Sequence, residues 1–315
     1  MILCGCRPVP RNAALPPIKV AVQYWPGMYW LGIADAKGWF KEAGLNVQLV
    51  DTNTDYLASV KDLVKGRFDV NDLVLFDLLD SVARGADLVG VINVDYSSGA
   101  DKLIARPGIE QLADLKGKRI ALPQKSYLSY ILEVAIARAG LKINDVQIVD
   151  TPAEKAPETL IKGESDAILT FEPYATQGLD AVKGHNLFDT SQVPGLSPNL
   201  IVFHRKFIEE RQSEVAAFVQ VWLRATRFIK EHPDEAFVIA AVCNKKTPEE
   251  IRQFTLIDNI LGRRENELAF SFAASFDSLH GVTRQINDFM IAKGITSRKL
   301  DSGQFLDGSF IRALK

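Results

Sequence analysis

The sequence predicts an α/β fold with two lobes, each built on a mainly parallel sheet and joined to the other by a two-segment hinge. Two observations lead to this prediction: a strand–helix series that occurs twice, and a long helical remainder after it. The chain has 315 residues, enough for two lobes with a large buried core. Its hydrophobic share of 47% and charged share of 24% are ordinary for a globular protein.

The repeated series starts with "KVAVQYW" at Lys19 and again with "KRIALPQ" at Lys118. Each copy continues through a helical stretch that ends in Ala-Gly-Leu, a strand ("VQLV" or "VQIV"), and a second helix that ends in "LVKG" or "LIKG". Asp69 and Asp166 then open the third strands, and we expect them to act as turn or cap residues. Short apolar strands alternating with helices are typical of a parallel sheet covered on both faces.

Two crossovers and a helical tail complete the expected organisation. "LVGVINV" should finish the first sheet, with "DYSSG" as the first crossover, and "NLIVF" should be the strand that returns from the second lobe. Helical periods follow, including "TPEEIRQFTLIDNIL", which starts with a capping Thr and a Pro at the first helical position. We therefore assign residues 18–97 and 198–315 to lobe 1 and residues 98–197 to lobe 2.

Charge and motif content exclude several function classes. The net charge of -2, without basic clusters, gives no footprint for nucleic acid, and no apolar run is long enough to span a bilayer. The three cysteines and four histidines form no metal spacing. The sequence lacks G-x-S-x-G, P-loop and G-x-G-x-x-G motifs. We expect reversible binding of a small molecule, with no catalytic residue, metal or cofactor.

Ligands of open parallel sheets bind outside the carboxyl ends of the strands, and most tyrosines fall there. In "VQYWPGMYW" we expect Trp25 to form a wall of the cleft beside Tyr24 or Tyr29, while Trp30 and Trp39 pack inward. The candidate ligand-binding residues of lobe 1 are Tyr24, Trp25, Tyr29, Asn53, Tyr56, Asn71, Asp72, Asp95, Tyr96 and Ser97. Those of lobe 2 are Gln124, Lys125, Ser126, Tyr127, Phe171, Glu172 and Tyr174.

Two of these loops have alternative interpretations. The helix start at Ser126 can hold a negative group, or Ser126 can simply cap the helix. Glu172, between Phe171 and Pro173, can accept hydrogen bonds from an amine, amide or amidine, or it can be a solvated surface carboxylate.

The N-terminal segment suggests an anchor. "LCGC" resembles a bacterial lipobox in which Cys6 is lipidated, although the charged and most of the apolar parts of such a signal are missing from the printed start. The alternative is a chance match in an irregular terminus. If the true start lies upstream, residues 1–17 are a signal remnant and an extended Pro-rich tether.

The chain resembles the solute-binding proteins of ABC importers, in the branch of taurine, alkanesulfonate, nitrate and thiamine-pyrimidine binders. The matching stretches are "WPGMYWLGIADAKGWFKEAGLNVQLV", "LVKGRFDV", "DYSSGADKLIARPGIEQLADLKGKRIAL" and "LIKGESDAILTFEPY". The chain departs from the branch at Phe171, where Trp is frequent, and at Lys125, in a loop usually given to small residues.

The resemblance implies a bilobed type II periplasmic-binding-protein fold that closes over its ligand, with Trp25 against the ligand and Glu172 near an amino group. It further implies a monomer in the periplasm or cell envelope that delivers a sulfonate, an aminopyrimidine or a small nitrogen compound to a membrane permease. Two alternatives remain at this point: a ligand-sensing domain for a signalling partner, and a pyrimidine-forming enzyme on the same fold.

Overall fold

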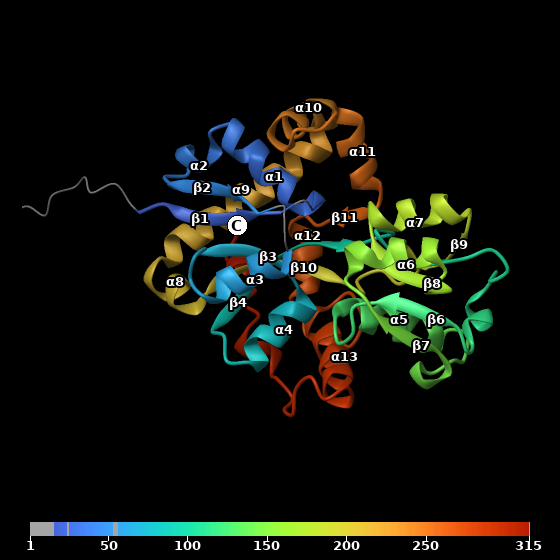
Figure 1. The fold of residues 1–315 in the computed structure, drawn as a ribbon. Coiled ribbons are helices and arrows are strands. Elements are labelled where there is room, and N and C mark those ends of the chain that lie inside the picture. Colours follow the sequence, from blue (N-terminus) through green and yellow to red (C-terminus); the bar gives the residue numbers. More distant parts are fainter. Residues whose placement is uncertain (1–15, 24, 53–55, 315) are drawn as a thin grey trace, which may run out of the picture.

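The chain folds around two separate β-sheets, seen at the left and right of Figure 1. The structure is a computed structural model that describes residues 16–23, 25–52 and 56–314. The six-stranded sheet has the order β11-β4-β10-β3-β1-β2, and the five-stranded sheet has the order β7-β6-β8-β5-β9. This architecture confirms the predicted α/β class with two sheets.

The strands of the six-stranded sheet come from both ends of the chain. They are β1 (Ile18–Val22), β2 (Val47–Asp51), β3 (Val70–Val74), β4 (Leu88–Ser97), β10 (Pro198–His204) and β11 (Asp258–Ile260). The strands of the five-stranded sheet lie between them in sequence. They are β5 (Asp101–Ala105), β6 (Arg119–Leu122), β7 (Gln147–Asp150), β8 (Ala167–Phe171) and β9 (His185–Asp189). We call the part built on the six-stranded sheet lobe 1 and the part built on the five-stranded sheet lobe 2.

Helices connect and cover the strands, and the C-terminal third of the chain is mainly helical. The helices before β10 are α1 (Pro26–Ala36), α2 (Trp39–Glu42), α3 (Tyr56–Val64), α4 (Leu75–Ala83), α5 (Tyr127–Ala137), α6 (Ala156–Lys162) and α7 (Tyr174–Val182). Those after it are α8 (Arg205–Glu210), α9 (Gln212–Glu231), α10 (Pro233–Asn244), α11 (Pro248–Leu256), α12 (Arg263–Ala269), α13 (Leu279–Ala292) and α14 (Ser309–Arg312). No helix in the described ranges combines the length and apolar character needed to cross a membrane.

The sequence repeat corresponds to a structural repeat. β1 pairs in parallel with β2 and β3, and β6 pairs in parallel with β7 and β8. In each copy an aspartate holds the first strand: Asp69 Oδ2 accepts from the Lys19 backbone N–H at 2.8 Å, and Asp166 Oδ2 accepts from the Arg119 N–H at 2.9 Å. Asp166 also forms an ion pair with the Arg119 guanidinium. Both aspartates therefore have a structural role, but they hold a neighbouring strand and are not the turn or cap residues that we expected.

The sheets are mixed rather than mainly parallel. β10 runs antiparallel to β3 and β4, β11 runs antiparallel to β4, and β5 runs antiparallel to β8 and β9. The reason lies in the two crossovers, because β4 leads directly into β5 and β9 leads back into β10. A strand that enters a lobe from the other lobe runs against the strands of the local repeat.

The region after Thr247 differs from the expected single helix. α11 ends at Leu256, and Asp258–Ile260 form β11 at the edge of lobe 1. The apolar spacing of Ile257, Ile260 and Leu261 fits a helix, but pairing with β4 places Asp258–Ile260 in a strand. Pairing register places Asp258 opposite Ser97 and Ile260 opposite Asp95.

Candidate ligand-binding site

Trp25 lies at the junction of β1 and α1 in lobe 1. Its extended backbone precedes α1, and Pro26 occupies the first helical position. The partly buried indole donates a hydrogen bond from Nε1 to Oδ2 of Asp95 at 3.0 Å. A Cβ on Gly27 would lie 1.9 Å from the same oxygen, so this position needs glycine. The motif thus brings an aromatic ring and a carboxylate into contact.

Three carboxyl groups gather beside this junction. Asp72 on β3, Asp95 on β4 and Asp258 on β11 are between 0% and 5% exposed. Asn199 Nδ2 donates to Asp95 Oδ1 at 2.5 Å, and Asp258 contacts the Asp95 carboxyl. Burial raises the pKa of Asp95 to about 7, against the hydrogen bonds from Asn199 and Trp25. Burial and the charge of Asp95 also raise the pKa values of Asp72 and Asp258 well above the ordinary value.

Two tyrosines bind further carboxylates. Tyr56 on α3 donates its hydroxyl to Oδ2 of Asp77 at 2.6 Å, and the Val74 backbone N–H donates to the same hydroxyl at 3.1 Å. Tyr127 at the start of α5 hydrogen-bonds the buried Asp101 on β5, whose pKa burial raises to about 6. The negative charge of Asp77 also acts on Tyr127, because lobe 1 and lobe 2 meet here.

Asn71 and Ser97 are occupied by contacts within the protein. Asn71 is fully buried and lies inside β3, not after it; its Oδ1 accepts from Gln23 Nε2 at 2.9 Å, and its Nδ2 donates to Ser59 Oγ at 3.1 Å. The Ser97 hydroxyl, at the β4–β5 crossover, lies 2.6 Å from the hydroxyl of Thr190 at the β9–β10 crossover. Ser97 therefore ties the two crossovers together.

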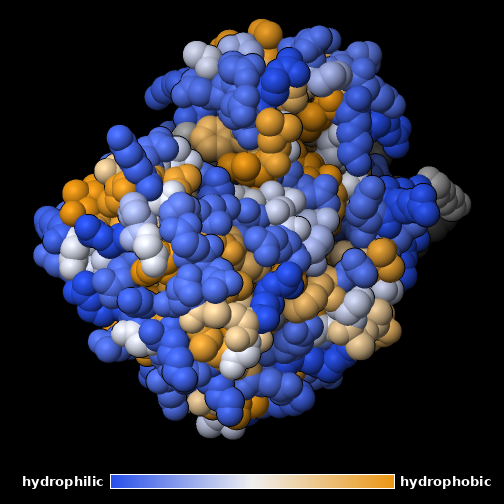
Figure 2. All heavy atoms as spheres, turned by 90° about the vertical axis from the view of Figure 1, so that its right-hand side faces the viewer, coloured by the Kyte–Doolittle hydropathy of each residue, from blue (hydrophilic) through white to orange (hydrophobic). Residues whose placement is uncertain are grey.

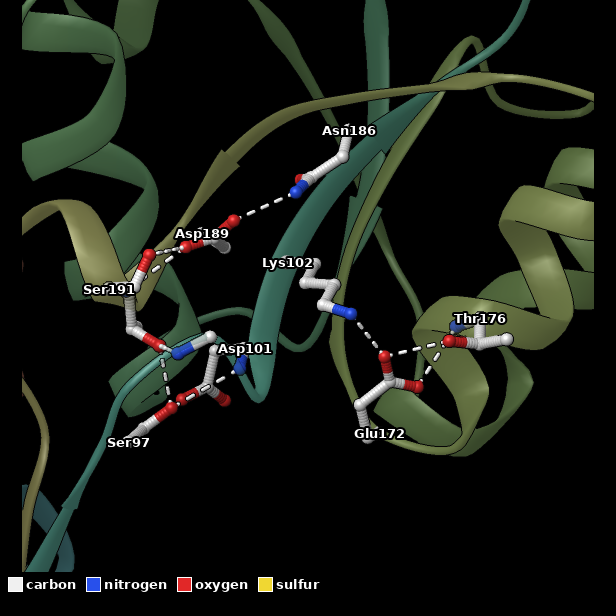
Figure 3. Close-up of polar contacts among 10 residues, drawn as sticks. Ser97, Asp101, Lys102, Glu172, Thr176, Asn186, Asp189 and Ser191 are labelled. Atoms are coloured by element: carbon white, nitrogen blue, oxygen red, sulfur yellow. Dashed lines mark hydrogen bonds and ion pairs between the residues drawn. The ribbon is translucent and has the colours of Figure 1, made fainter. Parts of the chain in front are cut away.

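Glu172, after β8, is paired with a lysine of the neighbouring strand β5. Figure 3 shows the Glu172 carboxylate between Lys102 and the first turn of α7. Lys102 Nζ lies 2.5 Å from Oε1, and Thr176 donates its hydroxyl at 2.8 Å and its backbone N–H at 3.1 Å. The side chains of Lys102 and Glu172 are 19% and 10% exposed. These contacts satisfy the carboxylate without a ligand.

The remaining candidates vary in their surroundings. Phe171 and Tyr174 are partly buried and form an edge-to-face pair with centroids 5.5 Å apart. Ser126 caps α5, Gln124 and Lys125 are exposed, and Lys125 has a left-handed backbone with φ 55°.

Two tyrosines of lobe 1 differ sharply in exposure. Tyr96, inside β4, is partly buried, whereas Tyr29 is 1% exposed and packs against Phe254. Tyr24, Asn53 and Cys6 lie outside the described residues.

Sequence reasoning missed several residues around the site. Asp77 and Asp101 were not among the predicted site residues, and Asp258 was placed within a helix. Asn199 follows a proline in the return crossover, and its polar side chain before the apolar "LIVF" was the one local signal. The structure brings the aspartates together through strand pairing across distant parts of the chain.

The molecular surface is hollowed on one side. On the face shown in Figure 2, hydrophobic side chains gather below the upper part of the molecule, which α10 and α11 form in Figure 1. Leu256, the last residue of α11, is one of the exposed hydrophobic side chains at 67%. The chain then enters β11 and Asp258.

Comparison with known proteins extends this geometry. The family described as "NMT1/THI5 like" matches residues 25–236, which include Trp25, all of the five-stranded sheet, and β2, β3, β4 and β10 of the six-stranded sheet. The chain belongs to the NMT1/THI5-like family. The resemblance noted in the sequence is therefore confirmed at the level of the family.

Individual relatives of this NMT1/THI5-like protein are binding proteins. A putative aliphatic sulfonates-binding protein of Bacillus subtilis is 25% identical over 95% of this chain and 88% of its own length. The taurine-binding periplasmic protein of Escherichia coli is 25% identical over 69% of this chain and 68% of its own. The crystal structure of the periplasmic aliphatic sulphonate binding protein SsuA from Escherichia coli matches with a TM-score of 0.73 at 17% identity, over 91% of each chain. The fold is that of periplasmic binding proteins, and the relatives place the chain with binding proteins rather than enzymes.

Proposed function

We propose that this NMT1/THI5-like protein binds a small polar solute between its two lobes and delivers it to an ABC importer. The solute classes under consideration are sulfonates, aminopyrimidines and small nitrogen compounds. The observation that carries the proposal is the meeting of polar side chains from both lobes. Asp77 of lobe 1, which binds Tyr56, acts on Tyr127 of lobe 2. Asp101 of lobe 2 acts on Asp258, which contacts Asp95 in lobe 1. Ligands of open α/β sheets bind at such strand ends.

Closure of the lobes around the solute fits the connection between them. The chain passes from lobe 1 to lobe 2 between β4 and β5 and returns between β9 and β10. The hydroxyls of Ser97 and Thr190 link these two crossovers, and Thr190 also accepts from the Gly99 backbone N–H at 2.9 Å. Gly99 has φ 111°, a conformation that favours glycine. A short double connection of this kind is a hinge that lets two rigid lobes rotate.

We further propose the site of action and the partner. The relatives named above include a periplasmic binding protein, so we place this protein in the periplasm or cell envelope with a membrane permease as partner. The protein acts as a monomer, with lobe 1 made of residues 18–97 and 198–315 and lobe 2 of residues 98–197. Cys6 carries a lipid anchor, and residues 1–17 form the tether.

A thermal-shift screen with sulfonates, aminopyrimidines and small nitrogen compounds tests the binding function. A solute at a hundred times its dissociation constant should add roughly 2.7 kcal/mol to the free energy of unfolding. Small-angle scattering with and without that solute should show a smaller radius of gyration in the bound state. Binding without compaction contradicts closure, and the absence of a shift with all three classes contradicts the function.

A further inference from the structure

The carboxyl cluster, defined as Asp72, Asp95 and Asp258, lacks a cationic partner. Each of the three residues is at least nine-tenths buried. Among the described residues, no lysine, arginine or histidine forms an ion pair with any of them; Asp95 accepts from neutral donors, the Trp25 indole and the Asn199 amide. Buried carboxylates normally require a paired positive charge, because leaving water costs several kcal/mol per ion.

Oxygen atoms in this cluster are also left without donors. Oδ1 of Asp72 and both carboxyl oxygens of Asp258 accept no hydrogen bond from the described part of the chain. Nearly all buried polar atoms in folded proteins have a partner. A proton shared with the Asp95 carboxyl accounts for one Asp258 oxygen, so Asp72 Oδ1 and the second Asp258 oxygen still need an explanation. Asp258 contacts the Asp95 carboxyl, which accepts a hydrogen bond from Trp25. The Asp258 oxygens that lack donors therefore lie near the junction of β1 and α1.

The nearby lysines do not compensate for this negative charge. Lys102 is engaged by Glu172, as Figure 3 shows, and Lys125 is exposed on the loop before α5. Wherever the carboxyls are ionised, an anionic solute at the cluster would meet like charges, which costs several kcal/mol in a desolvated site. A cation that donates N–H groups satisfies the same oxygens, and the partly buried indole of Trp25 offers it an aromatic surface.

We propose that the solute of this protein carries a guanidinium, amidinium or ammonium group, which pairs with Asp95 and Asp258 and contacts Trp25. This assignment rests on the proposed binding function and names its solute class. The cluster is buried in this structure, so the cation enters when the lobes are apart and is enclosed when they close. Asp72 supplies a further acceptor behind the pair.

Cation binding should release protons from the cluster. The titratable groups that face Asp95 and Asp258 are Asp72 on β3 and Asp101 on β5, and Tyr56 on α3 faces Asp72. Their mutual proximity and burial favour the protonated carboxyls in the empty protein. A cation favours the ionised forms, so its affinity should increase as pH rises from about 5.5 to about 8. A sulfonate would show the opposite dependence.

The decisive experiment compares two probes with the same propyl chain, propylguanidinium chloride and sodium propane-1-sulfonate, with EDTA present. We expect the guanidinium to raise the melting temperature and the sulfonate to leave it unchanged. The Asp258→Asn variant should lose the shift. The matched Asp288→Asn variant, whose carboxylate is 69% exposed on α13, should keep it. Titration calorimetry in buffers of different ionisation enthalpy should then record proton release on guanidinium binding.

Each outcome decides between the two proposals. A shift with the sulfonate alone, lost in Lys125→Gln, overturns the cation assignment and leaves the binding function standing. If neither propyl probe nor any compound of the wider screen raises the melting temperature, both the cation assignment and the binding function are contradicted. A guanidinium shift that persists in Asp258→Asn places the cation elsewhere and overturns the assignment. The empty Asp258→Asn protein should melt higher than the parent at about pH 8, because a repelling charge is removed; a lower melting temperature indicates a structural role and also overturns it.

Discussion

The indole Nε1 of Trp25 donates to the Asp95 carboxylate at 3.0 Å, which joins the loop after β1 to the end of β4. The two residues are 70 positions apart in sequence. This contact places a partly buried aromatic ring beside the carboxyl cluster and beside the first turn of α1. The first two predictions test the ring and the glycine that accommodates the carboxylate.

Replacing Trp25 should weaken binding more than folding. Trp25→Ala removes the aromatic wall, and stacking of this kind is worth about 1–3 kcal/mol, or roughly ten- to a hundredfold in affinity. The control is Trp39→Ala, because Trp39 is 6% exposed and packs against Phe228 with centroids 5.5 Å apart. That variant should lose about 3–5 kcal/mol of stability. Calorimetric titration and thermal melting measure both; unchanged affinity in Trp25→Ala contradicts the ligand wall.

Gly27→Ala should disturb the same site from the opposite side. The added methyl group would overlap Oδ2 of Asp95, so the carboxylate or the start of α1 must move, at a cost of about 1–3 kcal/mol. Gly303→Ala is the control, since its Cβ would meet nothing closer than 3.5 Å. Thermal melting compares the two variants. Equal melting temperatures would show that Asp95 does not occupy this position in solution.

The empty protein should become less stable as pH rises toward neutrality. Asp95 has a pKa of about 7 in the folded protein against an ordinary value of 3.8, so the folded state binds this proton more tightly than the unfolded state. The resulting stability is present below about pH 4 and is lost as pH rises through about 7. Asp77 and Asp101, with pKa values raised by burial to about 6, act in the same direction. Burial lowers the pKa of His280, which acts in the opposite direction.

Asp95→Asn isolates the contribution of this carboxyl. The variant removes the titrating proton and leaves His280 in place, so its stability should depend less on pH between about 5 and 8 than that of the parent. Denaturant unfolding at several pH values gives the two slopes. Parallel slopes for variant and parent would contradict the raised pKa of Asp95.

Glu172→Gln distinguishes a structural ion-pair role of the Glu172 carboxylate from a ligand-binding role. Its partners are Lys102 and Thr176, and removing the charge leaves Lys102 unpaired in a partly buried position. We expect a loss of about 1–3 kcal/mol of stability, between the values for surface and buried pairs, with solute affinity unchanged. The double variant Lys102→Met/Glu172→Gln should recover part of the loss. Lower affinity at unchanged stability would instead make Glu172 a ligand residue.

Cys6→Ser should release the protein from the membrane fraction of its native host. The prediction depends on the lipobox-like "LCGC", because stable anchoring requires a multiply acylated cysteine. Cys4→Ser is the matched control and should leave the protein membrane-bound. Fractionation without detergent measures the distribution. A parent protein already found entirely in the soluble extract would exclude the anchor.

Local patterns in the sequence determined the repeated framework of this protein. The doubled strand–helix series and the helix start at Thr247 and Pro248 were predicted from nearby residues. The burial of Trp30 and Trp39 followed from helical spacing in the same way. These features depend on backbone propensity, capping and periodicity. Such effects act over a few residues, so they can be recognised in a single sequence.

Tertiary structure alone decided which polar groups meet. Asp258 joins Asp95 only because β11 pairs with β4, although the local pattern favoured a helix. Glu172 is neutralised by Lys102 because β5 enters lobe 2 antiparallel to β8, a direction set by the crossover and not by either strand. The charge state of the cluster depends on burial and on neighbours distant in sequence. Such long-range electrostatic contacts leave no local periodicity, so the character of the site emerged only from the folded chain.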